Sequence, residues 1–265
     1  SDTIIAPKGR HFYGHGVYSE ETKLLYLTEN NYKYPDERSG SIGIYSPYKD
    51  FKRIGELPSY GIGPHELKVD NNGNLVVANG GILTHPDYPR VKLNITNIES
   101  NITIINKKNG LLKKTIKLPK KNKQLSIRHI DIDLNENIYA GCQIYNRKSK
   151  EFLSTIFKYS LKNIEFFEFP KIFQSMNNYI GTVKFLGEQN FVIASFPRAG
   201  KVIVWENKNL NLVSYLNHYD ACGLATNPYT QEILVSSGEG KIISIDKKNI
   251  IFNKKYNFDN HFLAL

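Results

Sequence analysis

A short motif recurs about every fifty residues, and this spacing constrains the fold more than any other feature of the sequence. His15, His65, His129 and His261 each open a strand-like apolar run, and Cys222 occupies the same phase. Positions 15 and 261 lie 246 residues apart over five intervals, an average of about 49 residues. Repeats of about 40–50 residues are typical of four-stranded propeller blades. The sequence therefore predicts an all-β protein, a β-propeller of four-stranded blades.

Each repeat shows the same order of apolar runs and turns. Turn signals such as Asn71-Asn72-Gly73 and Asn135-Glu136-Asn137 follow the first run. Further runs rich in β-branched and aromatic residues complete the unit, as strands require. Phe166–Gln174 has room for a short helix or a loop. We expect a single propeller domain with repeats at 14–63, 64–127, 128–179, 180–219 and 220–258, and a closing inner strand at 259–265.

The repeat predicts that polar side chains gather at one mouth of a central channel. Inner strands of all blades start on the same face of a propeller, and the antiparallel second strand returns to that face. The second runs end, in equivalent positions, at Glu29, Asn79, Cys142, Ser195 and Ser237. Two sets of equivalent positions, the starts of the first runs and the ends of the second runs, thus predict polar side chains that could bind a ligand at the same mouth.

Several longer segments resemble a known family. They are Gly9–Gly16, Gly61–Leu67, Val77–Ile82 with Thr84–Pro86, Leu125–His129, Gly141–Gln143, Pro197–Gly200, Cys222-Gly223 and Asp259–His261. On these segments the chain resembles the exported bacterial propeller family catalogued as domain of unknown function 1513, which is related to lactonase and quinoprotein-type propellers. The resemblance runs from residue 9 to the C-terminus.

The resemblance implies a periplasmic protein with a role in handling iron or copper. Members of the family usually carry a twin-arginine export signal, and their genes often lie beside imelysin-like and di-haem oxidase-like iron-uptake genes, whose products are expected partners. The family has seven blades, whereas this chain has five complete repeats and partial ones. We therefore expect that the chain is a fragment, or that another chain or segment fills the gap, with Thr3–Ala6 as one candidate blade-mate.

The four histidines in equivalent positions of the repeats have two possible roles. His15, His65, His129 and His261 could hold neighbouring blades together, or at least three of them could bind a transition metal, because imidazole suits iron, copper and zinc. Cys222 is either an inert buried thiol or a thiolate ligand. The candidates for orienting the histidines, or for acting as oxygen ligands, are Glu29, Glu66, Asn79 and Asp131.

Other residues in the same segments have open roles. Cys142 could form a disulfide with Cys222 if the protein is exported. His11 and His85 flank the predicted site, and the long loop Gly80–Asn94 is either a lid over the mouth or a packed Ω-loop. The arginines of these segments, Arg10, Arg128 and Arg198, could clamp an anion or pair with acidic residues between blades.

The charge and hydropathy of the sequence argue against two classes of function, nucleic-acid binding and membrane insertion. The net charge of +10 comes largely from lysine runs at 107–123 and 241–255, which we interpret as solvated outer loops, so no nucleic-acid partner is expected. The sequence contains no run of eighteen apolar residues, so we expect no membrane-spanning helix. No Ser-His-Asp order or nucleophile motif is visible, so the catalytic residues stay unknown. Three functions remain: a metal-binding protein, a metal-dependent hydrolase or oxidase, and a non-catalytic docking propeller.

Overall fold

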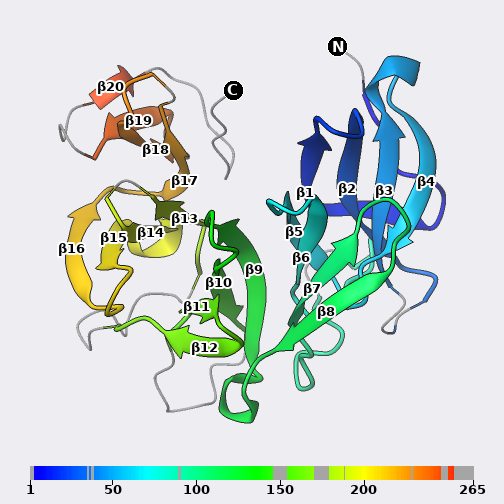
Figure 1. The fold of residues 1–265 in the computed structure, drawn as a ribbon, viewed down its shortest axis with the longest axis horizontal. Helices are drawn as coiled ribbons and strands as arrows, with labels where there is room; N and C mark the ends of the chain where they lie inside the picture. Colours follow the sequence, from blue (N-terminus) through cyan, green and yellow to red (C-terminus); the bar gives the residue numbers. More distant parts are fainter. Residues whose placement is uncertain are drawn as a thin grey trace. The chain divides into compact units, whose positions relative to one another are not determined.

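The computed structural model describes residues 3–34, 36, 39–88, 91–145, 154–169, 179–187, 189–227, 229–245 and 250–253. Within these residues, twenty strands form five four-stranded antiparallel sheets, each a meander of consecutive strands (Figure 1). This arrangement confirms the predicted four-stranded antiparallel blades. No helix in the described part of the chain is both long enough and apolar enough to cross a membrane.

Each sheet consists of four consecutive strands, and the third sheet begins at Leu125, before the expected repeat boundary at residue 128. The first contains β1 (Arg10–Ser19), β2 (Leu24–Asn31), β3 (Gly40–Ser46) and β4 (Lys52–Pro58). The second contains β5 (Pro64–Val69), β6 (Asn74–Asn79), β7 (Asn101–Asn106) and β8 (Leu112–Lys117). The third contains β9 (Leu125–Ile132), β10 (Ile138–Ile144), β11 (Ile156–Ser160) and β12 (Asn163–Phe166). The fourth contains β13 (Thr182–Leu186), β14 (Phe191–Phe196), β15 (Lys201–Glu206) and β16 (Leu212–Asn217), and the fifth β17 (Ala221–Thr226), β18 (Ile233–Ser237), β19 (Lys241–Ser244) and β20 (Ile250–Asn253).

Some expected boundaries differ from the structure. The first inner strand begins at Arg10 rather than near His15, because a bulge between Phe12 and Gly16 lets the pairing with β2 continue backwards. Thr3–Ala6 forms no strand. The expected closing strand at 259–265 lies outside the described residues.

The predicted turns are held by a recurring aspartate. Asp70 Oδ1 accepts hydrogen bonds from the backbone N–H groups of Asn72 and Asn74 at 3.0 and 2.7 Å. Gly73, which lies between these two residues, has a positive φ of 75°. In the third sheet, Asp133 Oδ1 accepts the N–H of Asn135 at 2.9 Å in the same way. A short carboxylate that bonds to N–H groups two and four residues ahead closes a tight turn.

The chain divides into two compact units, one of residues 1–128 and 144–149 and the other of residues 129–143 and 150–265. In the first unit, the apolar faces of two neighbouring sheets pack together: Tyr26, Ile42 and Leu57 against Leu67, Leu75 and Val77. In the second unit, Tyr139 and Ile156 pack with Val183, Val192 and Trp205. Burial of such side chains contributes roughly 1.5–3 kcal/mol each, so these faces supply the main stabilisation of each unit.

The first two inner strands approach each other closely at Gly14. A Cβ on this residue would lie 2.4 Å from the backbone oxygen of His65, far inside van der Waals contact. The absence of a side chain at Gly14 therefore sets the spacing between β1 and β5, and with it the spacing of the residues that follow on each strand.

We expect Gly14→Ala to lower the free energy of unfolding by about 1–3 kcal/mol, the usual cost of overpacking, because the backbone of β5 must move away. Urea unfolding measures the change. Gly55→Ala is the matched control, since a Cβ on Gly55 meets only the Ile44 side chain at 3.7 Å. Equal stability of the wild type and Gly14→Ala would contradict the close approach.

Candidate functional site

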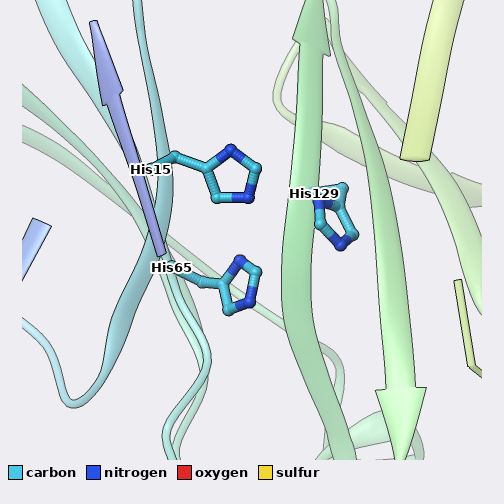
Figure 2. A group of neighbouring side chains, drawn as sticks. All are labelled: His15, His65 and His129. Carbon is cyan, nitrogen blue, oxygen red and sulfur yellow. The ribbon is translucent and has the colours of Figure 1, made fainter. Parts of the chain in front are cut away.

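His15 on β1 and His65 on β5 lie side by side in the first unit (Figure 2). Their ring centroids are 5.1 Å apart, and a ring nitrogen of one lies within 4.8 Å of a ring nitrogen of the other. Both side chains are partly buried. The structure therefore brings together two of the histidines that the repeat pattern selected.

A threonine that the sequence did not single out fixes this pair. The hydroxyl of Thr28 accepts the backbone N–H of His15 at 3.1 Å, and it lies 3.0 and 3.3 Å from the backbone oxygens of His15 and His65. Thr28 is almost fully buried on β2. One hydroxyl thus ties together the backbones that carry the two imidazoles. The only sequence signal was a polar residue directly after the apolar run Leu24–Leu27.

A carboxylate lies beside the histidine pair. Oε1 of Glu66, the residue after His65, is 4.0 Å from Nδ1 of His15, and it is also 4.0 Å from Nζ of Lys68. A carboxylate near one ring nitrogen of a histidine favours a proton there and orients the other nitrogen for ligand binding. Glu66 therefore lies beside His15, at a separation longer than a hydrogen bond.

His129 is buried on β9, and it is the first residue of the second unit. The four residues before it belong to the first unit and are anchored there: Ser100 Oγ donates to the oxygen of Leu125, and Ser126 Oγ donates to the oxygen of Gly80, both at 2.6 Å. Arg128, which precedes His129 directly, donates to the hydroxyl of Tyr145 at 2.9 Å. Figure 2 labels His129 on this strand.

Glu29 forms hydrogen bonds and ion pairs with other side chains of the first sheet. Its fully buried carboxylate accepts two hydrogen bonds from Arg53, at 2.8 and 3.2 Å, and one from the hydroxyl of Tyr45 at 2.6 Å. Arg10 Nε lies 3.6 Å away, and Arg10 also bonds to Glu56. Burial and the Glu29 carboxylate raise the pKa of Tyr45. The expected pairing of Arg10 with acidic residues is thus present, while Glu29 is engaged in the first sheet.

Asn79 and Asp131 hold neighbouring segments together. The side-chain amide of Asn79 donates hydrogen bonds to the backbone oxygen of Ser59 at 3.1 Å and to Asn101 Oδ1 at 2.8 Å. These bonds hold the segment that connects the first sheet to the second. In the second unit, Asp131 Oδ2 accepts the N–H of Phe185 at 2.8 Å, across from the third sheet to the fourth.

The remaining candidates lie in the second unit or outside the described residues. Cys142 and Cys222 are free thiols, so the disulfide is absent from this structure, and burial raises the pKa of Cys142. Cys222 Sγ lies 3.1 Å from the oxygen of Asp220. Arg198 lies 4.4 Å from the ring centroid of Tyr179. His261 lies outside the described residues.

The described residues of the loop Gly80–Asn94 bond to the first sheet at two points. Tyr13 donates to the oxygen of Ile82 at 3.0 Å, and Asn30 donates to the oxygen of Thr84 at 3.2 Å. Asn94 closes the loop on itself, since its amide nitrogen donates to Gly81 at 2.8 Å. These contacts favour the packed Ω-loop over the lid.

His11 lies beneath this loop, in contact with aromatic residues. Its ring is 6.0 Å from that of Tyr32, which in turn lies 5.1 Å from the ring of His85. Burial, and then the charge of His85, lower the pKa of His11. His11 is therefore held neutral in the folded protein at pH values where a free histidine begins to gain a proton.

We expect the buried carboxylate of Glu29 to contribute to the free energy of unfolding. Glu29→Gln removes the negative charge that two guanidinium groups share, and we expect it to lower the free energy of unfolding by about 3 kcal/mol. Glu56→Gln is the control in the same network, and its more exposed carboxylate should cost at most about 1 kcal/mol. Chemical denaturation compares the two. A larger loss in Glu56→Gln than in Glu29→Gln would show that the network is centred elsewhere.

The lowered pKa of His11 generates a prediction on pH. Because the unfolded chain binds the proton more readily, the neutral state of His11 contributes stability above pH 6.5, and this contribution is lost as the pH falls below that value. His11→Phe keeps the ring contact and removes the titration. We expect its unfolding free energy to fall less steeply between pH 7 and 5, by less than about 1.4 kcal/mol per pH unit, the limit for one proton. Identical slopes for the two proteins would refute the assignment.

Comparison with solved structures supports the fold. The chain is similar to a catalytically inactive variant of virginiamycin B lyase from Staphylococcus aureus, crystallised with quinupristin, at a TM-score of 0.65 and 16% identity, over 98% of this chain and 75% of that one. It is also similar to the β-propeller domain of Cps50 (Swd1) from Myceliophteria thermophila, at a TM-score of 0.57 and 9% identity, over 88% and 64%. At these identities the likeness shows the propeller fold alone.

Comparison by sequence gives the family. No sequence among the curated proteins matches the chain. The family described as "Protein of unknown function (DUF1513)" matches residues 1–265, the whole length of the sequence. The order of the motifs, the four-stranded sheets and this match agree, and the chain belongs to the DUF1513 family of β-propellers.

Proposed function

We propose that this propeller binds a transition-metal ion through His15, His65 and His129, and that it handles iron or copper in the periplasm. The observation that carries the proposal is the pair of imidazoles on β1 and β5, whose backbones one buried hydroxyl ties together. Imidazole nitrogens are the common ligands of copper, zinc and iron. Partial burial limits competition from water while leaving room for an ion to enter.

His129 is proposed as the third ligand because of its place on β9. The residues before it are bonded to Ser100 and Gly80 in the connection between β6 and β7, so its backbone follows directly from an anchored segment. Each of the three histidines can offer one ring nitrogen. Three imidazoles leave a coordination position for a water, a substrate or a further ligand. Cys222 and His261 are the candidates for that further ligand.

Glu66 strengthens the proposal. Its carboxylate lies 4.0 Å from Nδ1 of His15, and a proton on that nitrogen would leave the lone pair of Nε2 available to a metal. Removal of such an orienting partner typically weakens metal binding about 10–100-fold. The role in iron or copper acquisition, the export to the periplasm and the imelysin-like and di-haem oxidase-like partners rest on the family resemblance.

The test is metal binding by purified protein stripped with EDTA. We expect the wild type to bind about one equivalent of Cu²⁺, Zn²⁺ or, without oxygen, Fe²⁺, as measured by titration and elemental analysis. His15→Ala, His65→Ala and His129→Ala should each weaken binding at least tenfold, because each removes one ligand, and Glu66→Gln should weaken it by about 10–100-fold.

His218→Ala is the matched control. His218 is a partly buried histidine of the second unit outside the proposed site, so its loss should leave the metal content unchanged. The proposal fails if the wild type retains no metal, or if the three ligand variants bind as much metal as His218→Ala does.

A further inference from the structure

A cavity of about 930 Å³ lies in the first unit, where the chain passes from β4 to β5. Arg10, Glu56, Tyr60 and Lys117 are among the described residues that line it, and the histidines of the proposed metal site are not. Pockets of about 300–1,000 Å³ accommodate small organic molecules. The size alone makes this cavity a candidate binding site separate from the histidines.

One wall of the cavity is a fixed network of charges. Arg10 and Arg53 both bond to the carboxylate of Glu56, Arg53 at 2.5 Å, and Arg53 also holds the buried carboxylate of Glu29. Two guanidinium groups face two carboxylates, so the charges of the network balance. Arg10 and Glu56 thus present a donor and an acceptor to the cavity, held in place by their partners.

An aromatic residue, Tyr60, also lines the cavity. Tyr60 has a positive φ of 55°, which is unfavourable for a residue with a side chain. Its hydroxyl donates to the oxygen of Gly110 at 2.8 Å, and its own backbone oxygen accepts a bond from Asn101 at 3.2 Å. The side chain is nevertheless 38% exposed. Strained residues that are held this firmly occur preferentially at functional sites.

The remaining charges of the lining also balance. Lys117 and Glu99 add one positive and one negative group to those of Arg10 and Glu56. An anionic ligand would have to lie against two carboxylates, and a cationic ligand against two basic groups. A hydroxyl group both donates and accepts hydrogen bonds, so a hydroxyl-rich molecule can use both kinds of partner.

We propose that this cavity binds a neutral, hydroxyl-rich small molecule of one or two rings, of the saccharide class. A ring of the ligand stacks on the fixed face of Tyr60. Its hydroxyl groups meet Arg10, Glu56 and Lys117 of the lining. Because the aromatic ring and the charged wall are already held in place, little ordering is needed on binding.

The test is saturation-transfer NMR and calorimetry with cellobiose, maltose and chitobiose, each alone, and with citrate as the anionic probe. We expect at least one disaccharide to bind and citrate to bind no better than that disaccharide. Thr115→Trp fills the cavity from β8, and it should weaken binding at least tenfold. Thr115 is an exposed strand residue that lines the cavity, where an aromatic residue suits the strand.

Two further variants make the test specific. Tyr60→Gly removes the stacking ring, and glycine suits the positive φ, so it should also weaken binding at least tenfold in a protein that still folds by circular dichroism. Tyr48→Ala removes a 75% exposed tyrosine outside the cavity and should leave the affinity unchanged. The proposal is overturned if no disaccharide binds, if citrate alone binds, or if Thr115→Trp and Tyr60→Gly retain the affinity of the wild type.

Discussion

The contact between β1 and β5 is the constraint on which the candidate metal site depends. Neighbouring inner strands are ordinarily kept apart by the side chains that pack between sheets. Here Gly14 removes one side chain, and the buried hydroxyl of Thr28 bonds to the backbone of both histidines. The result is a short distance between two strands that belong to different sheets. A repeat sequence can place histidines in phase, but only such a local contact brings their rings within reach of one ion.

The repeat could be predicted because its physical signals are local. Apolar runs of strand length, asparagine and aspartate at turns, and a constant spacing are all visible along the chain, and the five sheets follow them. The start of β1 was harder to place, since a bulge between Phe12 and Gly16 depends on pairing with β2 and leaves no periodic signal. Local propensity thus predicts the strands, whereas pairing decides where they end.

The roles of the polar residues could be predicted only in part. Glu29 and Asn79 occupy equivalent positions in the sequence, yet Glu29 binds Arg53 while Asn79 binds the backbone of Ser59. The difference lies in neighbours far along the chain. Gly43 leaves the space that the Glu29 carboxylate fills, since a Cβ there would lie too close to it. Phase in a repeat therefore predicts the location of a side chain more reliably than its partner.

The two proposed sites use charge in opposite ways. A metal site gains from neutral imidazoles, since protonation of a partly buried histidine costs desolvation energy and removes the lone pair that binds the ion. In the proposed site, the Glu66 carboxylate would favour a proton on Nδ1 of His15, the nitrogen that lies nearest to it. The cavity at Tyr60 instead pairs its charges, since Arg10 bonds to the carboxylate of Glu56. The first arrangement, as proposed, would select cations that imidazole nitrogens bind well. The cavity as proposed would favour neutral molecules through the geometry of their hydrogen bonds, so the two proposed sites call for ligands of different chemistry.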